Sequence, residues 1–136
     1  MINSFSADVA LLHDARIFGF LFDNNRESFN SAFYLYVQIF GDFNDDCYHM
    51  KKALIFFKDA KIINFSIEND VSQGQYFIKD LKEYCVFSGE KNYEFIFNSD
   101  DIQLKLNASS MALIVSEIEE SRSDQYLDTN WKALLY

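Results

Sequence analysis

The chain has 136 residues, of which 49% are hydrophobic and 18% aromatic, so it holds enough apolar material to fold as a single domain spanning residues 1–136. Its formal net charge of −9 and its lack of clustered Lys and Arg disfavour nucleic acid as a partner. No uncharged apolar run reaches the ~20 residues that cross a bilayer, and no basic segment followed by an apolar one opens the chain, so we expect a cytoplasmic protein without membrane contact.

Two apolar runs open the predicted β-structure. Arg16 to Asp23 (RIFGFLFD) and Ala32 to Phe40 (AFYLYVQIF) flank a polar turn at Asn24 to Asn30, which predicts a hairpin. The second run alternates with the period of two that is typical of a half-buried strand. The residues predicted to share its buried face are Phe33, Leu35, Val37 and Ile39, and those on its other face are Tyr34, Tyr36 and Gln38.

An acidic loop and a second pair of strands are expected next. Gly41 to Met50 (GDFNDDCYHM) mixes Gly, Asn and three Asp with aromatic residues, a composition typical of a loop. Ala53 to Phe57 (ALIFF) and Lys61 to Glu68 follow as two strands joined through Lys58 to Ala60. In the later strand, the alternation places Ile63, Phe65 and Ile67 on one face.

The stretch from Gln75 to Tyr84 fits either a helical stripe or a strand, and we expect a short turn or helix there, followed by a strand at Tyr84 to Ser88. Met111 to Glu119 (MALIVSEIE) favours a strand, with a helical turn as the alternative. The apolar segment from Trp131 to Tyr136 is expected to pack on the domain or on a partner. Because the chain has four Gly and no Pro, its turns must use Asn, Asp and Ser, which tolerate left-handed backbone.

The strongest β signal comes from two neighbouring runs, Tyr93 to Asn98 (YEFIFN) and Ile102 to Asn107 (IQLKLN). Ser99 to Asp101 between them has the length and chemistry of a hairpin turn. Together these segments give about eight strands with short turns and no alternation of strands with helices. The sequence therefore predicts a mainly β fold, an antiparallel sandwich or a strongly curved sheet of about eight strands, with room for one short helix.

The pair His13 and Asp14 is the first candidate for chemistry. A carboxylate beside an imidazole is typical of hydrolases, but neighbouring residues in a strand point to opposite faces, so this pair can meet only in a turn. The alternative interpretation is that both residues form hydrogen bonds that fix the entry to the first long strand.

Cys47, His49 and the Asp residues near them are of the types that bind zinc. However, no second Cys or His pair stands at a metal-binding spacing, and the Asp residues lack the pattern of a calcium loop. Cys85 lies in an apolar, aromatic context and is expected to be a small core residue rather than a nucleophile. We therefore expect free thiols, no catalytic residue, no metal and no cofactor.

Acidic residues that stand beside aromatic ones resemble protein-binding surfaces. Such a surface complements a basic protein, because complementary fields select and speed encounters. The predicted partner-binding residues are Asp42, Asp45, Asp46, Glu117, Glu119, Glu120, Asp124 and Trp131. The alternative is that the acidity only keeps the protein soluble.

Leu12 to Ile17 (LHDARI), followed by strand, polar turn and strand, resembles the opening of several families of small bacterial proteins. Ala53 to Phe65 (ALIFFKDAKIINF) resembles their second block, in which two strands flank a short charged turn. Some of these families are similar to immunity proteins of polymorphic or contact-dependent toxin systems. The resemblance covers about the first half of the chain, and it implies a single-domain inhibitor that binds a cognate toxin.

These observations lead to one main hypothesis and two rivals. The main hypothesis is a non-enzymatic protein-binding domain, and more specifically an immunity protein whose acidic surface neutralises a basic toxin such as a nuclease. The first rival is a small-molecule or lipid carrier in which the strands close into a β-barrel around an aromatic cavity. The second is a hydrolase that uses His13 or His49. The sequence leaves the oligomeric state and the identity of the partner open.

Overall fold

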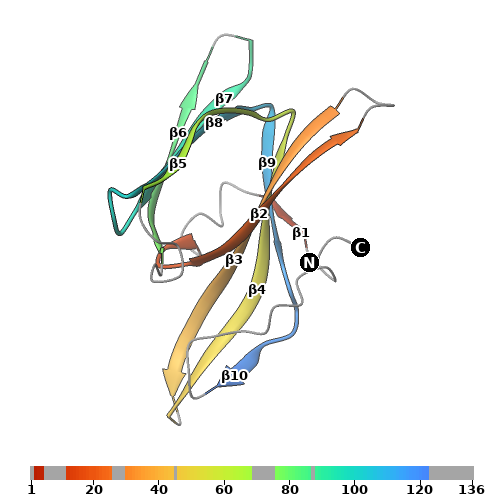
Figure 1. Cartoon of the computed structure of the whole chain (residues 1–136). Coiled ribbons are helices and arrows are strands. Elements are labelled where there is room, and N and C mark those ends of the chain that lie inside the picture. The colour runs from red at the N-terminus through yellow and green to blue at the C-terminus, as the bar shows by residue number, and fades with distance from the viewer. Residues whose placement is uncertain are drawn as a thin grey trace.

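The computed structural model describes residues 2–4, 12–25, 30–44, 46–68, 76–86 and 88–122. Within these residues the chain forms ten strands in two antiparallel sheets, and no α-helix is present there (Figure 1). The prediction of a mainly β, antiparallel fold is confirmed. The two sheets do not close into a barrel in the described part of the chain, so the barrel required by the rival carrier hypothesis is not formed there.

The first sheet has the order β1-β9-β4-β3-β2, with β10 pairing beside β4. Its strands are β1 (Ile2–Ser4), β2 (Arg16–Asn25), β3 (Asn30–Asn44), β4 (Cys47–Lys58), β9 (Ser110–Val115) and β10 (Glu120–Arg122). The second sheet has the order β5-β8-β7-β6. Its strands are β5 (Lys61–Ile67), β6 (Ile78–Cys85), β7 (Lys91–Phe97) and β8 (Ile102–Ala108).

The core lies between the two sheets and is built by alternate residues of the strands. The predicted inward face of β3 is confirmed, since its four apolar residues are all buried, and β7 and β8 show the same alternation. Aromatic rings connect the layers. The ring of Phe57 on β4 lies 5.2 Å from that of Tyr93 and 6.0 Å from that of Phe95, both on β7. The sheets therefore share one apolar core.

Backbone hydrogen bonds join the sheets where β2 begins. The amide of Asp14 donates to the carbonyl of Ile78 at 2.7 Å, and the amide of Ile78 donates to Ala15 at 2.9 Å. A third bond runs from the amide of Ile17 to the carbonyl of Tyr76, at 3.0 Å. The start of β2 thus lies against the start of β6, which fixes the angle at which one sheet covers the other.

Arg16 occupies this junction and is buried, with 3% of its surface exposed. Its guanidinium carbon lies 5.1 Å from the ring centre of Phe77, 5.7 Å from that of Phe40 and 6.0 Å from that of Phe18. A cation over aromatic faces is attracted by their quadrupoles, more strongly when water is excluded. The arrangement holds together three strands, β2, β3 and the start of β6, and the sequence analysis did not foresee it.

The predicted acidic loop at Gly41 to Met50 is wrong. β3 continues to Asn44 and β4 begins at Cys47, so this stretch is the far end of a long hairpin in which Asn44 lies opposite Cys47. A register irregularity between Phe40 and Phe43 interrupts the pairing with β4 without ending it. The polar composition predicted a loop, but a two-stranded hairpin that projects beyond the core needs few apolar residues.

The strand pair predicted around Lys58 to Ala60 is also wrong. β4 and β5 belong to different sheets, so these residues form a corner at which the chain crosses from one layer to the other. The predicted face of β5 fails at Ile63, because the register shifts between Ile62 and Asn64 and turns Ile63 outward, with 58% of its surface exposed. Ile62 takes its place against the core.

The remaining differences concern the second half. The helix or turn expected at Gln75 to Tyr84, and the strand expected at Tyr84 to Ser88, are replaced by a single strand, β6, which ends at Cys85. The strand expected at Met111 to Glu119 stops at Val115. The hairpin turn at Ser99 to Asp101 is confirmed, and the Ser99 hydroxyl accepts a hydrogen bond from the Asp101 amide at 3.1 Å.

Candidate functional site

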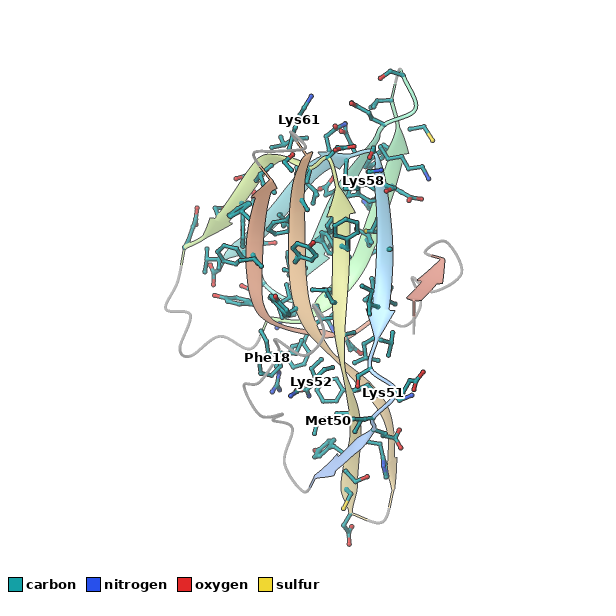
Figure 2. The ribbon with its side chains drawn as sticks, turned by 90° about the vertical axis from the view of Figure 1, so that its right-hand side faces the viewer. Phe18, Met50, Lys51, Lys52, Lys58 and Lys61 are labelled. Carbon is teal, nitrogen blue, oxygen red and sulfur yellow. The ribbon has the colours of Figure 1, made fainter. Side chains whose placement is uncertain are left out.

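A three-stranded arm extends from one end of the first sheet. It consists of residues 41–50, which form the far ends of β3 and β4, and of residues 116–122, which contain β10. In Figure 1 the ends of β3 and β4 reach beyond the rest of the sheet with β10 beside them. Figure 2 labels Met50, Lys51 and Lys52 where the arm leaves the sheet.

The root of the arm is buried and its contacts are specific. Met50 is fully buried, and its sulfur accepts a hydrogen bond of 2.8 Å from the side-chain amide of Gln38. Gln38 lies on the face of β3 opposite the core, with Tyr34 and Tyr36, as the alternation predicts, but it is fully buried there beside Met50. The amide of Ser116 donates to the carbonyl of Lys52 at 2.9 Å, where the chain continues beyond β9 along β4.

β10 completes the arm by pairing antiparallel to β4. Glu120 lies opposite Met50, and Ser121 lies opposite His49. The hydroxyl of Ser121 is 2.8 Å from Nδ1 of His49, and a carboxylate oxygen of Glu119 is 3.7 Å from the same nitrogen. Ser121 and Glu119 thus both contact His49, and these contacts attach β10 to the hairpin.

The structure brings together two groups of predicted partner-binding residues that are about 70 positions apart in the sequence. Asp42 lies on β3 and Asp46 in the turn that follows, while Glu117 and Glu119 lie in the link to β10 and Glu120 begins that strand. The other three predicted residues, Asp45, Asp124 and Trp131, lie outside the described residues.

The arm also concentrates the charge of the molecule. Its two segments, 41–50 and 116–122, hold six acidic residues and one Arg, which gives a net charge of −5 with histidine neutral, out of −9 for the whole chain. Lys51 and Lys52 follow at the root of the arm, on β4. More than half of the net charge is therefore carried by 17 residues at one end of the fold.

Ile118 is the feature of the arm that the sequence analysis missed. Its side chain is 72% exposed, the highest value among the exposed large hydrophobic residues of the described chain. It stands between the exposed residues Glu117 and Glu119, and its amide donates to the hydroxyl of Ser116 at 3.2 Å, which sets a turn. The sequence did contain a signal for an exposed Ile118, since it is a lone aliphatic residue among three Glu that follow the apolar run of β9.

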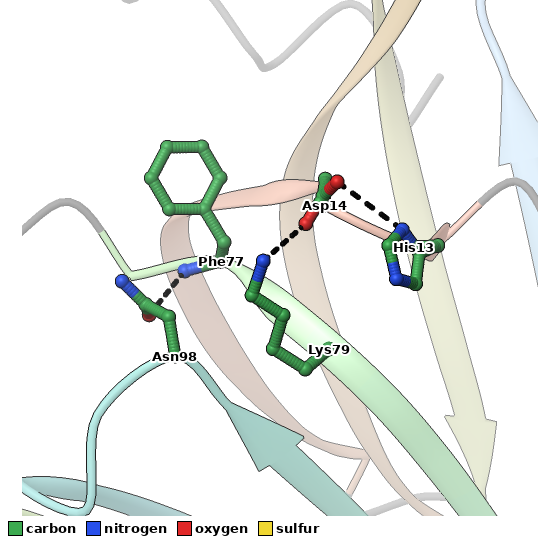
Figure 3. A network of polar contacts seen from close by, with 5 residues as sticks. All are labelled: His13, Asp14, Phe77, Lys79 and Asn98. Carbon is green, nitrogen blue, oxygen red and sulfur yellow. Dashed lines mark hydrogen bonds and ion pairs between the residues drawn. The ribbon is translucent and has the colours of Figure 1, made fainter.

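His13 and Asp14 lie in a turn, and their side chains contact each other there (Figure 3). Nδ1 of His13 is 3.2 Å from a carboxylate oxygen of Asp14, and Nζ of Lys79 on β6 is 2.6 Å from the other oxygen. The hydrogen bond from Lys79 holds the pKa of Asp14 below its usual value. Asp14 has a left-handed backbone, with φ of 62°.

The contacts of Asp14 are those of a structural link. They connect the start of β2 with β6, beside the backbone bonds that join the two sheets, and the Phe77 amide close by donates to the Asn98 side chain at 2.9 Å. The interpretation of the pair as a fixing point for the first long strand accounts for this geometry. Both side chains face solvent rather than a cleft.

The cysteines differ from each other in their surroundings. Cys47 is partly buried at the start of β4, and Cys85 is exposed at the end of β6; both are free thiols. The expectation of Cys85 in the core is wrong, because β6 is an edge strand whose residues after Leu81 are exposed. Among the described residues, no group of three or more His, Cys, Asp and Glu side chains is arranged to hold a metal ion.

A shallow hollow of about 220 Å³ lies along the β7–β8 hairpin, and the residues around it include Glu94, Gln103 and Lys105. In the region between the sheets, the inward aromatic residues of β3, β4 and β7 contact one another directly. This packing does not favour the carrier hypothesis. In the described part of the chain, no helix is long and apolar enough to span a membrane.

No protein-family model matches this chain, and no curated protein and no solved structure is significantly similar to it.

Proposed function

We propose that this protein is a non-enzymatic binding domain whose arm engages a basic protein partner. The observation that carries the proposal is the pairing of β10 with β4, which brings the backbones of two acidic segments side by side, with the exposed side chain of Ile118 in the link that leads to β10. Exposed apolar anchors surrounded by charge are typical of protein-binding surfaces. The partner chemistry that fits is a positively charged surface with an apolar pocket.

The more specific form of the proposal is an immunity protein. A basic toxin, for example a nuclease, would present to the arm the same positive groups that otherwise contact phosphates. Occupation of those groups by carboxylates would block the substrate. The resemblance of Leu12 to Ile17 and of Ala53 to Phe65 to such families supports this form, as does the concentration of negative charge on the arm.

The first prediction concerns electrostatic steering by the arm. The triple variant Asp46→Asn, Glu117→Gln, Glu119→Gln is expected to lower the association rate constant with the partner on the order of tenfold at low salt, because complementary fields speed encounters. The measurement is stopped-flow or surface-based kinetics over a series of salt concentrations, with a basic nuclease toxin domain that this chain neutralises as the partner.

The matched control carries the same change in charge on the second sheet, as Glu68→Gln, Glu90→Gln, Asp100→Asn. It should associate at nearly the wild-type rate. Equal slowing of both triple variants would show that only the total charge matters and would contradict a role for the arm. The single change Ile118→Ala should instead speed dissociation by at least tenfold, because exposed anchors act through contacts formed after encounter.

A further inference from the structure

The two sheets of the described chain have four edge strands, β1 and β2 in one sheet and β5 and β6 in the other. An exposed strand edge offers backbone groups that can pair with another chain, and natural proteins protect such edges by shortness, charge or irregularity. β1 is three residues long, and β5 is interrupted by the register shift at Ile63. β6 carries exposed charged residues, namely Lys79, Asp80, Lys82 and Glu83.

β2 has a register irregularity between Ile17 and Gly19, and Arg16 at its start pairs with Phe77, but from Gly19 onward neither shortness nor irregularity protects its edge. From Gly19 to Asn25 it pairs with β3 in one unbroken register, and from Ile17 to Phe22 it has no charged residue. Figure 2 shows it as the outermost strand of the first sheet. From Gly19 to Asn25 the edge is therefore regular and carries a single charge, that of Asp23, in a molecule whose net charge is −9.

The exposed residues of β2 are apolar on both faces. Phe20, Leu21 and Phe22 are 48%, 40% and 51% exposed, and Leu21 points to the face opposite the two Phe. Phe20 and Phe22 lie on the core side, where the ring of Phe20 is 4.9 Å from that of Phe65. A partner that lay against one face would leave the other in water, whereas a strand added along the edge would contact both faces.

We propose that β2 pairs with β2 of a second copy of this chain, antiparallel and about a twofold axis at Leu21. In this register Phe20 of each copy lies opposite Phe22 of the other, and Leu21 lies opposite its own counterpart. Aromatic cross-strand pairs stabilise antiparallel strands. Asp23, the one acidic residue of the paired segment, falls opposite Gly19, so no like charges meet.

A second copy meets less electrostatic repulsion at the β2 edge than at the acidic surfaces of the chain. Two copies with a net charge of −9 each repel, and the repulsion is weaker where the contact carries little charge, as at Gly19 to Phe22, which has no charged residue. The same edge is not complementary to the acidic arm of another copy. Because the exposed part of β2 pairs with residues 33–35 of β3, and the arm begins at residue 41, this inference is independent of the proposed function.

The test compares two changes that each place a positive charge on an exposed aliphatic side chain. Leu21→Lys protects the β2 edge, and Ile63→Lys makes the same kind of change on β5, next to the irregularity. Sedimentation or light scattering of the full chain over a range of concentrations should show a dimer for the wild type and for Ile63→Lys. Leu21→Lys should weaken dimerisation at least tenfold, with an unchanged circular dichroism spectrum.

A wild type that stays monomeric throughout the range, or equal weakening by both changes, would overturn the proposal. Disulfide formation checks the register. With Cys47 and Cys85 both replaced by Ser, Leu21→Cys should form a linked dimer on mild oxidation much faster than Ile63→Cys, because opposed residues of antiparallel strands have Cα atoms roughly 4.5–5.5 Å apart, within the range of a disulfide. Equal rates of linkage would exclude the twofold register at Leu21.

Discussion

Tyr93 combines a buried ring with a polar contact at its tip. The residue faces the core from β7, and its direct cross-strand neighbour is Glu83 on β6. Loss of water around the phenol, together with the charge of Glu83 and its hydrogen bond, raises the pKa of Tyr93 to about 12. The cause is the same burial that makes Tyr93 part of the link between the sheets.

A pH dependence at alkaline pH follows for Tyr93. The folded protein keeps the phenol protonated up to a pKa of about 12, whereas a Tyr in the unfolded chain ionises near its usual value of 10. This contribution to the free energy of unfolding is fully present below pH 10 and is lost as the pH rises toward 12. The variant Tyr93→Phe should lack this part of the alkaline decline, measured by urea unfolding at several pH values.

The tyrosinate absorbance offers a second readout. The late ionisation step should disappear in Tyr93→Phe and remain in Tyr84→Phe, which removes an exposed Tyr of the same strand pair. Glu83→Gln should move the late step to lower pH, because a negative neighbour favours the protonated phenol. An unchanged titration in Tyr93→Phe would show that another residue is responsible.

Left-handed backbone at single residues was foreseeable from composition. With few Gly and no Pro, the chain was expected to turn at Asp, Asn and Ser, and the described residues with positive φ are Asp14, Asp46, Asp59, Ser88 and Gly89. The short side chains of Asp and Ser form local hydrogen bonds and tolerate this geometry. The residue type was therefore predictable, although the positions were not.

At the scale of elements, two corners carry the chain between the sheets, one from β4 to β5 and one from β8 to β9. They are bonded to each other through Ser109. Its amide donates to the carbonyl of Lys58 at 2.9 Å, and its hydroxyl lies 3.0 Å from a carboxylate oxygen of Asp59. Both crossings thus form one polar unit at the same end of the sandwich.

Removal of this link should measurably loosen the sandwich. Ser109→Ala is expected to lower the free energy of unfolding by about 1 kcal/mol or less, the usual net value of one hydrogen bond. Asp59→Ala should cost more, because Asp59 has φ of 52° and Ala tolerates left-handed backbone poorly. Asp59→Asn should cost less than Asp59→Ala. Urea unfolding provides the measurement, with Ser110→Ala as the control, and equal effects of the two Ser variants would contradict the link.

The strands were predictable where one face is buried and the register is regular. β3 and the β7–β8 hairpin show this, because alternate apolar residues mark the buried face in the sequence itself. β5 shows the limit. Its alternation predicted Ile63 inside, but a single register shift turns this residue outward, and such a shift depends on pairing with β8 about 40 residues away.

At the scale of the whole molecule, both sheets depend on one core, and Phe57 lies at its centre. Phe57→Ala is expected to lower the free energy of unfolding by about 3–5 kcal/mol, because a large cavity forms between β4 and β7. Unfolding should remain a single transition, seen at the same denaturant concentration by far- and near-ultraviolet circular dichroism.

The neighbouring residue supplies the control for this prediction. Phe56 points to the opposite face of β4, where its ring packs 5.1 Å from that of Tyr34 and is partly exposed. Phe56→Ala should therefore cost clearly less than Phe57→Ala. Two separate transitions in either variant would indicate that the sheets fold independently and would contradict the shared core.

The sequence by itself determined the fold class, the inward face of β3, the β7–β8 hairpin and the acidity of the segments that form the arm. These properties depend on residue type and on spacings of a few positions, so they can be inferred from local patterns. Only the tertiary structure decided that Lys58 to Ala60 form a corner and that Gly41 to Met50 belong to a hairpin. It also decided that β10 pairs with β4 of this hairpin. Each of these three features depends on pairing between residues that are distant in the chain, such as Glu120 with Met50. The alternation of side chains along one strand does not indicate which distant strand it pairs with.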